Sequence, residues 1–172
     1  MNMFAIAAVL AVGWSGPGPA AAQCLELPQL LSIGAARSAV AHPETIALLP
    51  ATEWQLQRAA SPTQDIVWTS VATNALGAAQ AQVLLRPYAG QPTPDVLLKT
   101  TQLACVRQMR ATLKRQGLKP VAVTCPNCEA QRYQAAGFVA TLYSGLKGDF
   151  PYLLVVHPLA PAGAAPSAVN RE

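Results

Sequence analysis

The chain has 172 residues, of which 52% are hydrophobic and only 12% charged, and its net charge at pH 7 is +4. This length excludes a large multidomain enzyme, and the apolar content excludes a wholly disordered chain. Alanine accounts for 33 of the hydrophobic residues, so large apolar side chains are fewer than the percentage suggests. We therefore expect one folded domain of ordinary size.

The first residues have the pattern of a secretory signal. An uncharged apolar run over residues 3–13 is followed by a Gly-Pro stretch at 16–19 and by an Ala-x-Ala site that ends at Ala22. This order predicts a signal peptide over residues 1–22 and a secreted or periplasmic mature protein. The run is far shorter than the roughly 20 residues that cross a bilayer as a helix, so we expect no transmembrane span.

All four cysteines would survive cleavage of the signal peptide. An even number of cysteines in an exported chain is typical of disulfides, and a bridge across roughly 80 to 100 residues would stabilise the fold by about 4 kcal/mol. Lipid anchoring at Cys24 is not favoured, because Gln23 stands where lipoprotein processing needs a small residue. The disulfide candidates, with three pairings open, are Cys24, Cys105, Cys125 and Cys128.

The first half of the chain predicts two short helices followed by strands. Leucine and isoleucine recur at helical spacing in 25–33 and 43–49. Residues 53–57 alternate between apolar and polar and begin a strand, and β-branched residues mark another at 66–71. Two more strands, 81–88 and 95–101, predict a hairpin.

The second half opens on the clearest helix, residues 103–116, which Gly117 is placed to end. Its expected inner side carries Leu103, Val106, Met109, Arg110 and Leu113. A strand over 119–124 follows, then a segment at 129–136 that is a short helix or an edge strand. A second hairpin joins 138–143 to 151–157, and residues 158–172 have the composition of a disordered tail.

Two segments of the chain resemble each other. Residues 81–101 align without a gap on 137–157, and both are strand, six-residue loop, strand. The likeness leaves open a duplication of a helix-plus-hairpin unit or two hairpins alike by chance. We therefore expect an α+β domain over residues 23–157, with an antiparallel sheet and helices packed on one of its faces.

This layout resembles small secreted bacterial proteins built from a repeated helix and three or four antiparallel strands. This resemblance implies no particular activity for the chain. A more distant analogy is to periplasmic inhibitor and envelope-assembly modules with two helices backed by an antiparallel sheet. The residues that carry the resemblance are the leader 3–22, Pro28 to Leu31, the pair Glu53 and Trp54, and the segment 109–123.

The motif Cys125-Pro126-Asn127-Cys128 follows a predicted strand. At the start of a helix, such a pair would form a redox site with Cys125 as the nucleophile, because the helix dipole stabilises a thiolate. A thioredoxin-type fold needs a helix, a strand and a helix before the proline-led strand, and only 22 residues separate Cys128 from Pro151. We expect a structural disulfide, and the thiol-disulfide protein is the alternative.

The sequence contains no motif typical of a hydrolase, a zinc site or a phosphate-binding site. A hydrolase would need a nucleophile beside His42 or His157, and there is no Gly-x-Ser-x-Gly elbow. The cysteines lack the second close pair of a zinc site. The chain also lacks a phosphate-binding glycine loop, so we expect neither cofactor nor metal and assign no enzyme activity.

Basic residues concentrate in and after the 103–116 helix. Such a face would meet anionic lipid, lipopolysaccharide phosphate or an acidic protein, or it is only a solvated helix surface. We expect a non-catalytic binding or structural module whose partner is a protein or cell-envelope component, not nucleic acid. The candidate contacts are Arg107, Arg110, Lys114, Arg115 and Lys119; the aromatic residues from Trp54 to Tyr152 are assigned to the core.

Overall fold

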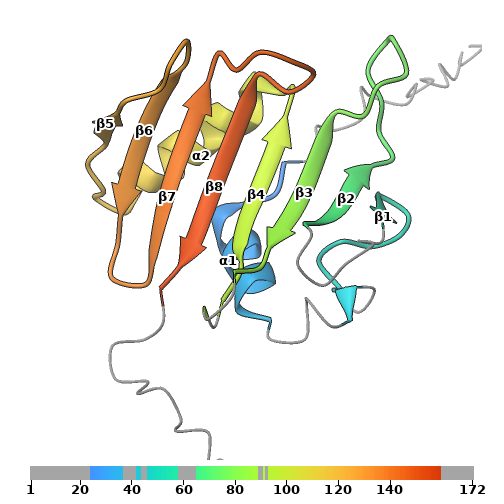
Figure 1. Ribbon diagram of the computed structural model, residues 1–172, viewed down its shortest axis with the longest axis horizontal. Coiled ribbons are helices and arrows are strands. Elements are labelled where there is room, and N and C mark those ends of the chain that lie inside the picture. Colours follow the sequence, from blue (N-terminus) through green and yellow to red (C-terminus); the bar gives the residue numbers. More distant parts are fainter. Residues whose placement is uncertain are drawn as a thin grey trace, which may run out of the picture.

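The computed structural model describes residues 24–36, 42–43, 46–57, 65–88, 91 and 93–159. In this part of the chain, two helices accompany an antiparallel sheet of eight strands, which confirms the α+β class (Figure 1). Neither helix has the length and apolarity needed to cross a membrane. The predicted signal peptide and residues 160–172 of the predicted tail lie outside the described residues.

The elements follow one another as a helix and four strands, twice. The first set is α1 (Leu27–Ala35), β1 (Trp54–Gln57), β2 (Ile66–Ser70), β3 (Ala81–Arg86) and β4 (Asp95–Thr100); the second is α2 (Leu103–Arg115), β5 (Val121–Val123), β6 (Glu129–Gln134), β7 (Phe138–Ser144) and β8 (Tyr152–Pro158). The strand order is β1-β2-β3-β4-β8-β7-β6-β5. Each set of strands is therefore a meander, and the two meet where β4 pairs with β8.

Both predicted hairpins are confirmed, and three expectations need correction. Residues 129–134 form a strand, β6, and it is not at the edge of the sheet because β5 pairs on its outer side. Residues 46–49 of the predicted second helix form turns instead. Pro158, expected to begin the tail, is buried and ends β8 opposite Phe138.

Alternating strand residues supply one face of the core. Ala81, Val83 and Leu85 of β3 are buried in the same cluster as Val96 and Leu98 of β4, while the residues between them are absent from it. Successive strand side chains point to opposite faces, so this set defines a core face and a second face. The buried cluster also holds four of the predicted core aromatics: Trp54, Trp68, Tyr133 and Phe138.

The prediction that aromatics form most of the core is only partly right. Tyr88 is 41% exposed, and Tyr143, Phe150 and Tyr152 are half-buried. Branched aliphatic side chains from the strands fill most of the remaining core. These pack against a pleated surface with little loss of side-chain freedom, which is why strands favour them.

Both helices contribute to this same cluster. From α1 come Leu27, Leu30 and Ile33, spaced three residues apart. From α2 come Val106, Met109 and Leu113, as the periodicity predicts. Leu103, also expected inside, is 40% exposed because it is the first residue of the helix.

Gly34 lies at a close contact between α1 and the sheet. A Cβ added there would lie 2.8 Å from Cγ of Pro158 and 2.8 Å from Cγ2 of Val96. Alanine normally stabilises a helix interior by about 1 kcal/mol relative to glycine. We expect Gly34→Ala to do the opposite and to lower the free energy of unfolding by about 1–2 kcal/mol, because the added methyl overpacks the contact.

Urea unfolding of Gly34→Ala and Gly137→Ala measures this effect. A Cβ at Gly137 meets no atom within 4 Å, so that variant is the control and should keep the wild-type midpoint. A Gly34→Ala protein as stable as the wild type would contradict the close contact.

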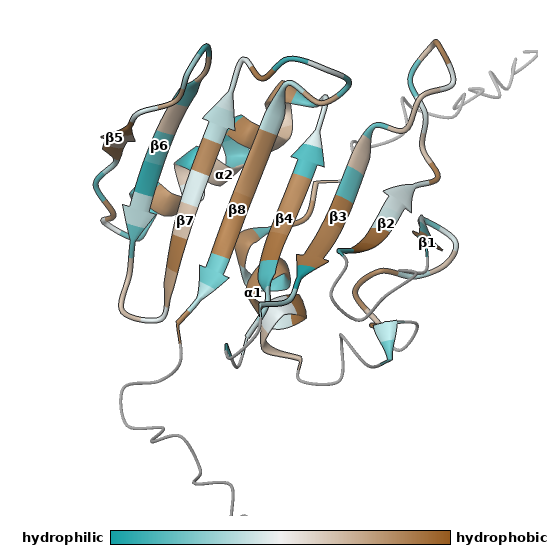
Figure 2. Ribbon diagram, viewed as in Figure 1, coloured by the Kyte–Doolittle hydropathy of each residue, from teal (hydrophilic) through white to brown (hydrophobic). Residues whose placement is uncertain are grey.

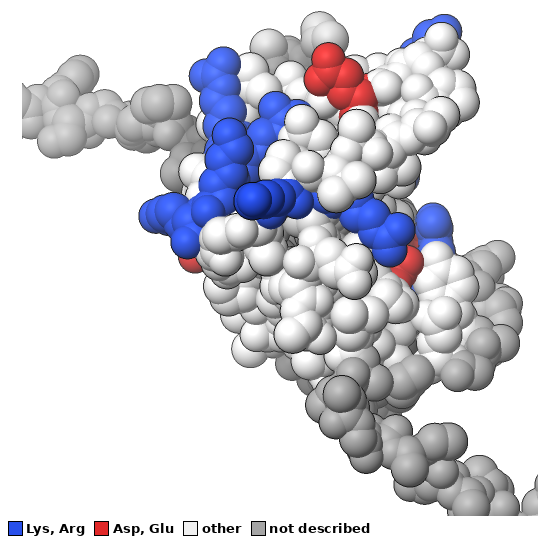
Figure 3. All heavy atoms as spheres, turned by 90° about the vertical axis from the view of Figure 1, so that its left-hand side faces the viewer, with Lys and Arg blue, Asp and Glu red and all other residues white. Residues whose placement is uncertain are grey.

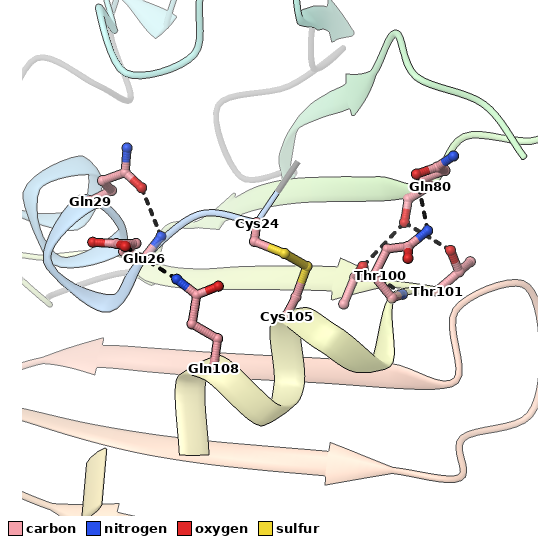
Figure 4. The surroundings of a disulfide bond; sticks show 9 residues. Cys24, Glu26, Gln29, Gln80, Thr100, Thr101, Cys105 and Gln108 are labelled. Atoms are coloured by element: carbon pink, nitrogen blue, oxygen red, sulfur yellow. Dashed lines mark hydrogen bonds between the residues drawn. A yellow bond between two sulfur atoms is a disulfide. The ribbon is translucent and has the colours of Figure 1, made fainter. Parts of the chain in front are cut away.

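The cysteines form two disulfides. Cys24 pairs with Cys105, 81 residues away, and joins the start of α1 to α2 (Figure 4). Beside this bridge, Nε2 of Gln108 donates to Oε1 of Glu26 at 3.2 Å. Cys125 pairs with Cys128, so one of the three pairings left open by the sequence is realised. The long bridge therefore ties the amino-terminal helix to the second half of the chain.

Candidate functional site

The predicted basic side chains lie on and just after α2. Arg107, Lys114 and Arg115 are exposed on the helix, and Lys119 is exposed in the segment that leads to β5. Figure 3 shows the corresponding end of the molecule, where Lys and Arg side chains gather in a band with few acidic ones. We call Arg107, Lys114, Arg115 and Lys119 the basic surface.

Within the described part of the chain, the cations of the basic surface have no carboxylate partner. The ion pair found there joins Arg86 to Asp65, a second contact joins the imidazole of His157 to the carboxylate of Asp95, and neither includes a residue of the basic surface. Lys114 and Arg115 stand in the last turn of α2, where positive charge is favourable to the helix dipole. That local role accounts for two of the four charges, and Arg107 and Lys119 lie outside the last turn.

Arg110, the fifth predicted contact, does not share this environment. It is half-buried, and its Nη2 lies 3.4 Å from Oγ of Ser144 at the end of β7. Its Nε is buried with no hydrogen-bond partner in the described part of the chain. The side chain therefore fills the boundary between α2 and the sheet instead of facing outward.

The motif Cys125-Pro126-Asn127-Cys128 forms the connection between β5 and β6. The backbone N–H of Cys128 donates to the carbonyl of Cys125, and Asn127 has a φ of 62°, the left-handed conformation common in tight turns. The segment that follows is a strand, so no helix begins here. The electrostatic reason for a low thiol pKa in redox motifs is therefore missing at this position.

A row of paired polar side chains crosses the second face at one end of the strands. Arg86 of β3 donates from Nε and Nη2 to both carboxylate oxygens of Asp65, the shorter distance being 2.7 Å. Nδ1 of His157 on β8 lies 2.5 Å from Oδ1 of Asp95 on β4, and the Tyr88 hydroxyl donates to the other oxygen of Asp95 at 3.2 Å. These pairs hold four neighbouring strands in register.

The electrostatics of this row shift two pKa values. The hydrogen bond to Asp65 raises the pKa of Arg86, which keeps the guanidinium charged. Burial raises the pKa of Tyr88, and the negative charge of Asp95 adds to this effect, because a phenolate beside a carboxylate is disfavoured. Tyr88 therefore remains a neutral hydrogen-bond donor to Asp95.

His157 has half of the arrangement that a hydrolase would need. Asp95 orients its ring, as the third member of a triad orients the base. Within the described residues, the hydrogen bond found for the ring is the one to Asp95, and none joins it to a hydroxyl or thiol. His42 is exposed in a short described segment far from this row in sequence. The geometry therefore supplies a register contact and no assembled nucleophile.

Between this row and the far ends of the strands, the second face is apolar. Leu84 of β3 pairs with Val67 on one side and with Leu97 on the other, and Leu97 pairs with Val155 of β8. Leu84 and Leu97 are buried even though they lie outside the core cluster. Figure 2 shows the apolar colouring on the central strands β3, β4 and β8, with β6 hydrophilic.

A hollow of about 370 Å³ opens beyond this apolar row. Three strand residues line its floor: Gln82 of β3, Lys99 of β4 and Leu153 of β8. Gln82 and Lys99 are paired neighbours, as are Lys99 and Leu153. The connection from β7 to β8 supplies the wall, through Leu146, Lys147, Asp149 and Phe150. We call this hollow the loop pocket.

Neither the loop pocket nor the row of paired polar side chains was predicted from the sequence. The predicted hairpin of 81–88 with 95–101 indicates part of each. In the observed register, Arg86 lies opposite Asp95 and Gln82 lies opposite Lys99. What the sequence does not contain is the pairing of β4 with β8, which brings His157 to Asp95 and Leu153 to Lys99.

No protein-family model, no curated protein and no solved structure matches the chain.

Proposed function

We propose that the chain is an exported, non-catalytic module that binds an anionic component of the cell envelope through its basic surface. The observation that carries this proposal is the set of four exposed cations on and after α2 that have no carboxylate partner among the described residues. Charged groups left unpaired on one side of a protein attract and steer a partner of opposite charge.

Export to a secreted or periplasmic location is part of the same proposal. Both disulfides support it, because disulfides persist in oxidising compartments and are rare in the cytosol. The signal pattern of residues 1–22 supports it independently of the folded domain.

We also infer that the helices cover one face of the sheet and that the two halves are a duplication. Figure 1 draws α1 and α2 behind the sheet, and the apolar side chains of both belong to one cluster. Each half is a helix followed by four strands, and the last strand of each lies at the centre of the sheet. This arrangement would leave the second face uncovered by either helix.

Vesicle binding tests the basic surface. We expect the protein to co-sediment with vesicles that contain phosphatidylglycerol and not with vesicles of phosphatidylcholine alone, and added salt should weaken the binding. The double variant Arg107→Glu/Lys114→Glu should lose more than about thirtyfold in affinity, because each basic residue near an anionic surface contributes about 1 kcal/mol and reversal of the charges adds repulsion.

The matched control compares the single variants Arg107→Glu and Arg132→Glu, because Arg132 is an exposed arginine outside both the basic surface and the loop pocket. Each single variant replaces one positive charge by one negative charge, so the net charge falls from +4 to +2 in both. Equal losses in the two variants would show that overall charge, not the basic surface, governs binding. A wild-type protein that ignores anionic vesicles and binds soluble polyglutamate would point to an acidic protein partner and refute the envelope proposal.

A further inference from the structure

The loop pocket combines positive charge, a hydrogen-bonding amide and apolar wall area in one hollow. Lys99 is half-buried on the floor, and Lys147 stands on the exposed wall. Neither ammonium forms an ion pair with a described carboxylate, and Asp149, also in the wall, is not within 4 Å of either. Two cations and one carboxylate leave the pocket with one net positive charge.

The cation on the floor has no countercharge beside it among the described residues. A half-buried lysine packs its aliphatic stem against its neighbours and keeps its ammonium group open to water and to ions. Here Lys99 has Gln82 and Leu153 as its cross-strand neighbours, an amide and an apolar side chain. An anion that entered the pocket would supply the missing countercharge.

The wall is held in a defined shape. The segment from 145 to 151 turns through two glycines with positive φ, Gly145 at 78° and Gly148 at 107°. The backbone N–H of Leu146 donates to the carbonyl of Pro151 at 3.1 Å and closes the base of the loop. Because the loop is closed in this way, the pocket exists before a ligand binds, which lowers the entropic cost of binding.

We propose that the loop pocket binds a small organic anion with an apolar body. The anionic group, a carboxylate or a phosphate, pairs with Lys99 and Lys147, and Gln82 donates an additional hydrogen bond. The apolar body lies against Phe150, Leu146 and Leu153. A volume of about 370 Å³ is at the low end of the range for small-molecule sites, which fits a compact ligand. This site is separate from the basic surface and does not depend on it.

A titration followed by ¹H–¹⁵N correlation spectra tests the site with naphthalene-2-carboxylate and its uncharged isostere naphthalene-2-carboxamide. We expect the acid to shift the amides of residues 82, 99 and 146–153 and to bind about tenfold more tightly than the amide, because only the acid makes a charge-assisted contact. A parallel titration with 2-naphthyl phosphate identifies which of the two anionic groups the pocket prefers.

The variant Lys99→Met keeps the aliphatic stem and removes the charge. We expect it to lose about tenfold in affinity for the acid and to bind the amide as the wild type does. Arg132→Met removes a charge of the same sign from an exposed position outside both the loop pocket and the basic surface, and is the matched control. Phe150→Ala should weaken the acid and the amide alike, because it removes apolar wall area.

Three outcomes would overturn the proposal. The first is an absence of localised shifts with the wild-type protein up to the solubility limit of the acid. The second is equal affinity for acid and amide, and the third is equal loss in Lys99→Met and Arg132→Met. Well-dispersed spectra of each variant show that it is folded, so a loss of binding reports on the pocket.

Discussion

Removing the bridge between Cys24 and Cys105 is expected to lower the free energy of unfolding by about 4 kcal/mol, close to half of what a domain of this size commonly has. The bridge joins residues that are 81 positions apart, and it therefore removes much conformational freedom from the unfolded chain. The suitable variant is Cys24→Ala/Cys105→Ala, because alanine avoids placing a hydroxyl at the buried Cys105. Guanidinium unfolding under non-reducing conditions measures the loss.

The second disulfide provides the matched control. Cys125 and Cys128 are three positions apart, so the same relation gives only about 2 kcal/mol for Cys125→Ala/Cys128→Ala. The ratio between the two double variants is therefore a sharper test than either value. If the short bridge proved the more stabilising, the structural role given to the long one would be wrong.

A single variant of the short bridge tests the thiol-disulfide alternative. A redox protein that used Cys125 would reduce insulin, and Cys125→Ser would abolish that activity. We expect no reduction of insulin by the wild type, since the motif lies in a hairpin connection and lacks the helix that stabilises a thiolate. Measurable reduction that disappears in Cys125→Ser would establish the alternative.

Replacing the hydroxyl of Ser70 is expected to cost about 2–3 kcal/mol, although only one atom is lost. Oγ of Ser70 accepts hydrogen bonds from the backbone N–H of Gln80 at 3.1 Å and of Ala81 at 3.0 Å, and donates to the carbonyl of Ala72 at 2.9 Å. The residue is buried at the end of β2, where these bonds close the connection to β3. Ser70→Ala would leave buried backbone groups without their acceptor and donor.

The neighbouring residue offers the opposite case. Oγ1 of Thr69 is buried and has no hydrogen-bond partner in the described part of the chain. Thr69→Val preserves the shape and removes this unpaired hydroxyl, so we expect unchanged stability or a gain of about 1 kcal/mol. Thermal unfolding of the two single variants measures the contrast. Similar losses in both would show that the hydrogen bonds of Ser70 contribute nothing specific.

Local patterns predicted most of the elements. The apolar spacing and Gly117 place α2 within one residue of its observed end, because a glycine with positive φ, 76° here, satisfies the last carbonyls of a helix. The β-branched run at 66–71 and the two hairpins are confirmed for the same reason, since their signals lie in neighbouring residues. Segment 129–136 could not be assigned because Ala130, Arg132 and Tyr133 suit either a helix or a strand.

The candidate sites were harder to predict from the sequence than the helices and strands. The basic surface was predicted because its residues are close together in the chain. The loop pocket was not, since Gln82, Lys99 and Leu153 become neighbours only through pairing between β3, β4 and β8. The cysteine pairing was left open for the same reason: it depends on the segment before α1 lying beside α2, and the sequence contains no local signal for that contact.

The outermost strands of the sheet are its shortest. β1 has four residues and β5 has three, whereas the six strands between them have five to seven. A free strand edge exposes backbone amides and carbonyls that can recruit another chain, and the growth of fibrils begins in this way. Few backbone amides and carbonyls are therefore exposed at either edge, and Lys119 and Pro120 stand just before β5. These features oppose edge-to-edge polymerisation at high protein concentration.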